Sequence, residues 1–233
     1  MPRPAILAAF AHPDDETFAI GGTLARARAA GLRTALWCAT DGEGGSDNRV
    51  RRPPDELARI RRLELVRALG VLGVDRLFAA GFPDGGLGEV PDERLEASLA
   101  AAVRAVRPAA IVTFGPEGAP NAHRDHQRVS TLATRAFAGL AAATPELRRL
   151  WHVSWSPPTP GDGRSPVLSA APPTCRVDVA PWLETKRRAF EAHATQRHHR
   201  AEFEAELRVV EEYTLAAGTP QSAPLADDLL TGL

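Results

Sequence analysis

Short apolar runs alternate with longer amphipathic stretches through the first 145 residues of the chain. The apolar runs predict buried β-strands at 5–11, 33–40, 76–80 and 109–114. The amphipathic stretches place apolar residues near helical spacing and predict helices at 17–30, 54–69, 92–106 and 124–142. Gly31 and Gly70 lie just beyond two of these helices, where glycine commonly ends a helix.

This alternation predicts βαβ units and a mainly parallel sheet with helices on both faces. The pattern changes after Pro145. From there on we expect strands at 150–155 and 174–179, a Pro/Gly-rich stretch at 157–173, helices at 182–195 and 201–214, and a loosely ordered tail from Gly218. The sequence therefore predicts one α/β domain, with a core at 1–145 and a small C-terminal extension of the same domain at 146–233.

Composition excludes several classes of partner. The chain has 233 residues, 44% of them hydrophobic, and a formal net charge of −1, so it offers no basic field for nucleic acid or an anionic membrane. The N-terminal apolar run ends at His12 and is too short for a signal peptide or a membrane span. Cys38 and Cys175 form no metal-binding pair, and we expect buried, reduced thiols in a cytoplasmic protein.

Polar, glycine-bearing segments follow each of the first four predicted strands. They lie at 11–16, 40–45, 81–87 and 115–126. Because ligands of open α/β sheets bind at the carboxyl ends of the strands, we expect these segments to meet around one site.

Two pairs of side chains in these segments have a spacing that suits metal binding. His12 and Asp15 are three residues apart at a strand-to-helix junction, and His123 and His126 have the same spacing at a helix start. Imidazoles and a carboxylate suit zinc and leave positions open for water and substrate. Taken singly, the acids could complement a helix dipole and the histidines could cap a helix or lie on the surface. The presence of both pairs at one sheet edge favours a site.

The motifs resemble those of the LmbE-like family, which is related to the GlcNAc-phosphatidylinositol de-N-acetylases (PIG-L). The resemblance rests on AHPDDE after the first strand, TDGEGGS after the second, Arg61 with Glu64, FPDGGL, HRDH, and KRRAFEAHATQ near the C-terminus, and it spans about residues 5–197. It implies a Rossmann-like three-layer sandwich, a mononuclear zinc site, and N-deacetylation of GlcNAc-containing substrates. HRDH replaces the commoner HPDH, and Asn121 stands about where thiol-biosynthetic relatives can carry a tyrosine.

By position, the resemblance implies that His12, Asp15 and His126 bind one Zn²⁺ per chain. It implies that Asp14 is the general base and that a protonated His123 polarises the carbonyl. These roles agree with the chemistry of amide hydrolysis, because zinc lowers the pKa of a bound water to about 7 and a carboxylate can then accept its proton. Fe²⁺ or another divalent ion fits the same ligands.

Other residues in the motifs have less specific roles. Asp125 is expected to hold the ring of His123 and keep it charged. Arg61 and Asp84 match positions that contact sugar hydroxyls in relatives, although Asp84 could equally be a turn residue. Glu64 is expected to pair with a nearby arginine. His193 could reach the substrate or serve packing.

The resemblance implies a small-molecule amino-sugar substrate, such as GlcNAc-inositol or GlcNAc-malate on a route to a low-molecular-weight thiol, and self-association into a homo-oligomer. One alternative is an amidase that cleaves thiol S-conjugates with the same site. Another is a non-catalytic sugar- or nucleotide-binding module. Against a dinucleotide module, GxGxxG is missing and the first turn carries three acids, which would repel a pyrophosphate.

Overall fold

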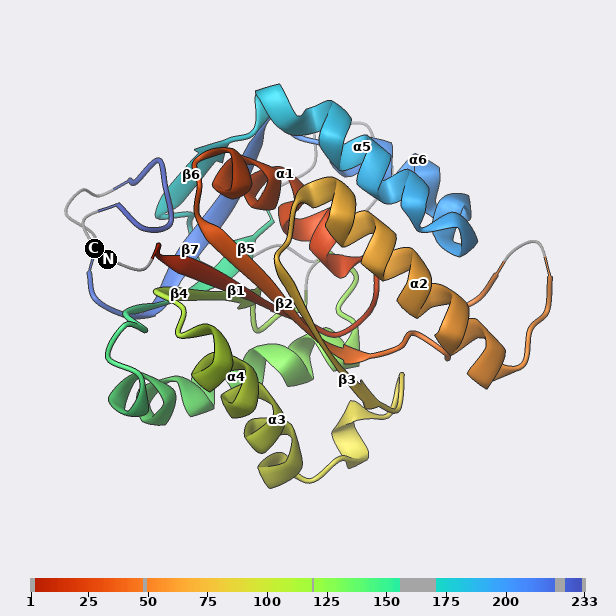
Figure 1. Cartoon of the computed structure of the whole chain (residues 1–233), viewed down its shortest axis with the longest axis horizontal. Helices are drawn as coiled ribbons and strands as arrows, with labels where there is room; N and C mark the ends of the chain where they lie inside the picture. The colour runs from red at the N-terminus through yellow and green to blue at the C-terminus, as the bar shows by residue number, and fades with distance from the viewer. Residues whose placement is uncertain (1–2, 48–49, 119, 156–170, 221–224, 232–233) are drawn as a thin grey trace.

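A computed structural model describes residues 3–231 of the chain, apart from 48–49, 119, 156–170 and 221–224. Its strands are β1 (Ala5–Phe10), β2 (Arg33–Thr40), β3 (Arg76–Phe82), β4 (Ala110–Phe114), β5 (Arg149–Ser154), β6 (Cys175–Asp178) and β7 (Val210–Gly218). Its α-helices are α1 (Asp15–Ala29), α2 (Pro54–Leu72), α3 (Asp92–Val106), α4 (Arg124–Ala143), α5 (Leu183–Ala192) and α6 (Arg200–Glu206). Helices α1, α2 and α5 cover one face of the sheet, and α3 and α4 cover the other (Figure 1).

The strands form one sheet in the order β3-β2-β1-β4-β5-β7-β6. The pairs from β3 to β5 are all parallel, and β7 is antiparallel to both of its neighbours. Every residue of β1 and β4 is buried, and so is every residue of β2 except Arg33. Strands covered on both faces have such continuous apolar runs. The predicted α/β fold with a mainly parallel sheet is confirmed.

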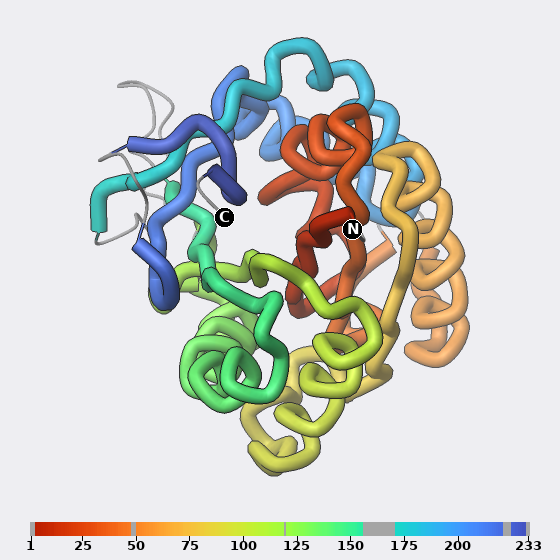
Figure 2. Tube along the Cα trace, turned by 60° about the vertical axis from the view of Figure 1, so that its left-hand side comes forward, coloured from red at the N-terminus to blue at the C-terminus, as the bar shows by residue number. Residues whose placement is uncertain are grey.

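The order of the strands reverses beside β1. The chain runs from β1 outward through β2 to β3, and then returns to add β4 on the other side of β1. The connections after β1 and β4 therefore lead to helices on opposite faces, with α1 on one side and α4 on the other, as the tube in Figure 2 also shows. Such a switch point opens a crevice at the carboxyl ends of the two strands.

The C-terminal half differs most from the prediction. The expected helix at 201–214 is wrong: α6 ends at Glu206, and β7 begins at Val210. In β7, Glu211 and Tyr213 are buried while their neighbours are half-exposed, and the strand is paired on both sides. Both edges of this segment form backbone hydrogen bonds to neighbouring strands, and its side chains are buried alternately as in a strand. These tertiary contacts outweigh the helical pattern of the local sequence. Strands β5, β6 and β7 extend the same sheet.

Smaller corrections concern where elements end. Helix α2 continues through Gly70 and ends before Gly73, whose φ of 74° suits the left-handed end of a helix. The tail is not loose where the structure describes it: Ala226 pairs with Cys175, and Leu229 is buried. Most of the Pro/Gly-rich stretch, 157–170, lies outside the described residues.

Both cysteines are buried and form no disulfide, as expected. Within the described part of the chain, no helix combines the length and the apolar character that crossing a membrane requires.

A buried ion pair joins α1, α5 and β7. Helix α1 is broken at Ile20, which has φ −141° and ψ 18°. The carboxylate of Glu211 accepts the amide hydrogens of Gly22 (3.0 Å) and Thr23 (2.7 Å) just after this break. The Lys186 ammonium lies 2.6 Å from the same carboxylate, and both side chains are at most 5% exposed. The pair therefore caps the second part of α1 and anchors β7 to the helical layer.

Replacing Lys186 with methionine is expected to lower the free energy of unfolding by about 3–5 kcal/mol, because it leaves the Glu211 carboxylate buried without its counter-charge. Urea denaturation of the wild type and of Lys186→Met measures this loss.

The matched control is Arg187→Met, one residue further along the same helix. Arg187 pairs with Glu204, and both side chains are about 40% exposed, so its loss should change stability by about 0–1 kcal/mol. If both variants lose the same free energy of unfolding, the buried pair contributes no more to stability than the exposed pair.

Candidate active site

A cavity of about 670 Å³ opens at the carboxyl ends of β1–β4. Each of the four connections after these strands contributes to its wall, as the polar segments predicted. The lining residues from these connections and from the first turns of α1 and α4 are His12, Asp14, Asp15, Gly44, Gly45, Asp84, Gly85, Pro120, Asn121, His123 and His126. The C-terminal half contributes Trp155, Gln196, His199, Glu202 and Glu206.

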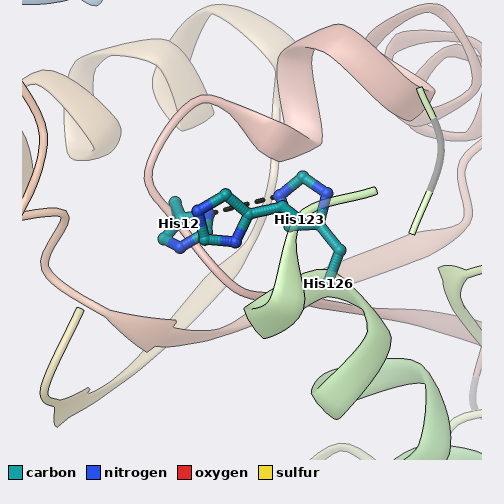
Figure 3. Close-up of side chains that lie close together, drawn as sticks. All are labelled: His12, His123 and His126. Carbon is teal, nitrogen blue, oxygen red and sulfur yellow. Dashed lines mark hydrogen bonds between the residues drawn. The ribbon is translucent and has the colours of Figure 1, made fainter. Parts of the chain in front are cut away.

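Donor atoms of three residues converge at the floor of this cavity. His12 Nδ1 lies 3.4 Å from Asp15 Oδ2 and 3.3 Å from His126 Nε2, and His126 Nε2 lies 3.2 Å from Asp15 Oδ1. Each of the three residues is at most 8% exposed. Figure 3 shows the imidazoles of His12, from the connection after β1, and of His123 and His126, from the start of α4, pointing toward one another. Donors this close can contact one divalent cation together.

The other nitrogen of His12 faces two carboxylates. His12 Nε2 lies 3.0 Å from Asp84 and 3.4 Å from Asp125. These acids are fixed by backbone amides: Asp84 accepts from Gly44 at 2.9 Å, and Asp125 from Gly85 at 2.8 Å. With a cation on the Nδ1 side, a carboxylate on Nε2 would keep the proton there and leave the Nδ1 lone pair for the cation.

Two further groups of side chains share His12 and have donor atoms within 4.8 Å of one another: His12 with His123 and His126, and His12 with Asp84 and Asp125. The second group lies on the Nε2 side, where backbone amides already engage the carboxylates. The Nδ1 side is therefore the better candidate for a cation.

Asp14 lies between the β1 connection and α1 with φ 107° and ψ −28°. Such a left-handed conformation costs a non-glycine residue roughly 1–3 kcal/mol. Its carboxylate does not cap α1; it lines the cavity and lies 3.2 Å from Arg61 Nη2. Burial raises the pKa of Asp14 to about 6, although the charge of Arg61 opposes the shift. Asp14 is therefore not a simple helix-capping acid.

The carboxyl group of Asp15 behaves in the opposite way. Burial alone would raise the pKa of Asp15, but the charge of His126 and hydrogen bonds with His12 and His126 hold this pKa below its usual range. The pKa values of these two adjacent aspartates thus shift in opposite directions. Asp15 remains an anion, whereas Asp14 can exchange a proton near neutral pH.

His123 precedes the first turn of α4, and its Nδ1 accepts the amide hydrogen of Asp125 at 3.1 Å. Asp125 thus contacts the His123 ring through its backbone amide, while its carboxylate binds His12 and the backbone amides of Gly85 and Leu87 after β3. Burial, together with the charges of His12 and His126, lowers the pKa of His123. An Nδ1 that accepts this amide hydrogen carries no proton, so in this structure the ring hydrogen lies on Nε2.

Arg61 and Asp84, both predicted to contact substrate, line the cavity but are engaged by the protein. Arg61 is 4% exposed, and its guanidinium donates to the carbonyls of Gly42 (2.8 Å) and Pro13 (2.6 Å). A side chain at Gly42 would collide with this guanidinium, which explains the glycine. Asp84 holds His12.

Two other residues singled out in the sequence bond partners inside the protein. His193 is fully buried and bonds Glu16, so it does not line the cavity. Glu64 accepts hydrogen bonds from the amide and hydroxyl of Thr195, not from an arginine.

Sequence reasoning missed the far wall of the cavity, which His199, Glu202 and Glu206 form. They come from α6 and the 3₁₀ turn before it (Ala194–His199). Nothing in their local pattern marks them, because their place depends on how α6 packs on α1, where Phe203 contacts Phe18.

The family model described as PIG-L, GlcNAc-PI de-N-acetylase, matches residues 7–137. A 1D-myo-inositol 2-acetamido-2-deoxy-α-D-glucopyranoside deacetylase from Rhodococcus jostii is 32% identical, with 82% of this chain and 81% of that protein covered.

Two solved structures share the fold. An N,N'-diacetylchitobiose deacetylase from Pyrococcus horikoshii superposes with a TM-score of 0.71 at 20% identity over 92% of this chain and 84% of that one. A 4-carboxy-2-hydroxymuconate hydratase from Pseudomonas putida gives 0.71 at 17% identity over 94% and 99%. The predicted resemblance is confirmed: this chain belongs to the PIG-L family.

Proposed function

We propose that this protein is a zinc-dependent N-deacetylase, which hydrolyses the acetamide of a small GlcNAc-containing conjugate. One observation carries the proposal: His12 Nδ1 and His126 Nε2 lie 3.3 Å apart, and the Asp15 carboxylate approaches them with Oδ2 at 3.4 Å from the first and Oδ1 at 3.2 Å from the second. A tetrahedral zinc site with bonds of about 2.0–2.1 Å places its ligand atoms about 3.3 Å apart. The donor set and its spacing fit this ion.

When bound, Zn²⁺ would supply Lewis acidity and lower the pKa of water at the site to about 7. Asp14, beside the ligand Asp15 and on the cavity wall, would accept the proton of the attacking water and return it to the leaving amine. A pKa near 6 suits both steps. Arg61 would keep the carboxylate aimed at the cavity through its 3.2 Å contact.

His123 would stabilise the oxygen of the tetrahedral intermediate. Its Nδ1 is occupied as an acceptor by the Asp125 amide, so the Nε2 hydrogen is the one that can be donated toward the cavity. A positioned neutral donor stabilises developing negative charge without any proton transfer. Phe114 stacks on His126, with ring centroids 3.9 Å apart, and fixes the plane of that ligand.

Because a solved hydratase has a similar fold, the fold alone does not specify the reaction. Amine release therefore has to be measured directly. Zinc-loaded protein should release primary amine and acetate from at least one of GlcNAc-inositol, GlcNAc-malate and N,N'-diacetylchitobiose. A protein that holds zinc but releases no amine from any of the three contradicts the proposed function.

Asp14→Asn is expected to lower kcat by about 10²–10⁴-fold while zinc content stays at one equivalent, because the amide keeps the shape of the carboxylate but cannot accept a proton. Steady-state amine release and metal analysis of the same samples test this. Asp55→Asn, at an exposed aspartate in the first turn of α2, is the control and should behave like the wild type. Unchanged kcat in Asp14→Asn would remove Asp14 from the reaction.

His126→Ala is expected to weaken zinc binding by at least about 100-fold, because it removes one of three protein ligands. Competition with a chelator measures the affinity, and a smaller zinc-induced rise in melting temperature reports it independently. His152→Ala is the control: His152 is a half-buried histidine of β5 that bonds Thr134, and its loss should leave affinity unchanged. Full affinity in His126→Ala would refute the ligand set.

A further inference from the structure

A second buried cluster lies behind the cavity. It consists of Glu16 and Thr17 in the first turn of α1 and His193 at the end of α5. All three are completely buried, and none of them lines the cavity. Their role is therefore not contact with substrate.

The Glu16 carboxylate links this cluster to Asp14. One oxygen accepts the Thr17 hydroxyl at 2.6 Å and lies 2.9 Å from His193 Nε2. The other oxygen accepts the backbone amide hydrogen of Asp14 at 3.0 Å. A fully buried carboxylate needs such donors, and a carboxylate can only accept, so His193 donates to it.

The amide that Glu16 holds belongs to the most strained residue of the site. Asp14 has φ 107°, a conformation that a non-glycine residue keeps only where its surroundings impose it. Its carbonyl accepts from the amides of Thr17 and Phe18, and its carboxylate contacts Arg61. Its own amide is fixed by Glu16. If the Asp14 peptide turned, the carboxylate would turn with it.

The segment that carries His193 is tied down at three places by hydrogen bonds. Thr195 donates to Glu64 of α2, and Gln196 donates to the carbonyl of Ser46 in the connection after β2. His193 makes the contact that reaches α1. These contacts connect the segment near the C-terminus to elements of the N-terminal half that build the site.

We propose, building on the deacetylase function above, that His193 is a positioning residue for Asp14. It holds the Glu16 carboxylate, and Glu16 fixes the peptide of Asp14, so that the Asp14 carboxylate enters the cavity in the direction needed to accept a proton. His193 acts on Asp14 through Glu16 and does not line the cavity.

The test compares His193→Leu, His193→Gln and Tyr213→Phe with GlcNAc-inositol, or with whichever panel substrate the wild type deacetylates. His193→Leu should lower kcat by about 10- to 100-fold, since small misplacement of a reacting group has effects of this size. KM should stay within about twofold and zinc at one equivalent. His193→Gln, whose amide can still donate to Glu16, should recover most of the lost kcat.

Tyr213→Phe is the matched control. The Tyr213 hydroxyl is also buried; it lies 2.6 Å from the hydroxyl of Thr23 in α1 and 3.3 Å from the Glu211 carboxylate, and neither of these partners bonds Asp14 or Glu16 in the described structure. This variant should lower the melting temperature as His193→Leu does but keep kcat within about twofold. An equal loss of kcat in both variants would mean that His193 only stabilises the fold, which overturns the proposal.

A double-mutant cycle gives the sharper comparison. In the Asp14→Asn background, His193→Leu should cause no further fall in kcat, because its effect passes through the missing carboxylate. A full additional fall would overturn the proposal. If the wild type deacetylates nothing, the deacetylase function fails separately, and a crystal structure of His193→Leu still decides: Asp14 should leave the left-handed region, and an unchanged φ would refute the positioning role.

Discussion

The central constraint in this molecule is the contact of two imidazoles and a carboxylate beside β1, at the point where the strand order of the sheet reverses. Parallel pairing of β1 with β4 brings the connections after these strands together, and the two helices that follow leave on opposite faces. His12 and Asp15 arrive from one side and His126 from the other. Their electron-rich atoms would repel one another without a proton or a cation between them, so the geometry makes sense as a cation site.

Around this centre, each buried carboxylate accepts hydrogen bonds from a different part of the fold. Asp84 and Asp125 accept from His12 Nε2 and from backbone amides, which fixes the ring and the turn after β3. Glu16 holds the strained peptide of Asp14, and Glu211 caps the broken α1. Each acid is matched to donors that the fold supplies. Asp14 differs from the other acids because burial raises its pKa to about 6, close to neutral pH.

The cavity of this protein is built from two different parts of the chain. The floor comes from the N-terminal motifs, but the far wall comes from α6 and the turn before it, with Glu202 and Glu206 facing the cavity. In this chain, the far wall of the cavity is therefore built by the segment with the least recognisable sequence pattern.

The sequence by itself determined the α/β fold, most strands and helices of the first half, and the gathering of polar segments at one sheet edge, because hydrophobic periodicity and strand-end chemistry are local properties. It did not determine β7, whose strand form depends on partners on both sides, nor the bonds of Asp84, Asp125 and His193. Those side chains are polar, and each has several reachable partners. Which partner each one binds depends on how distant segments pack, and only the tertiary structure decides that.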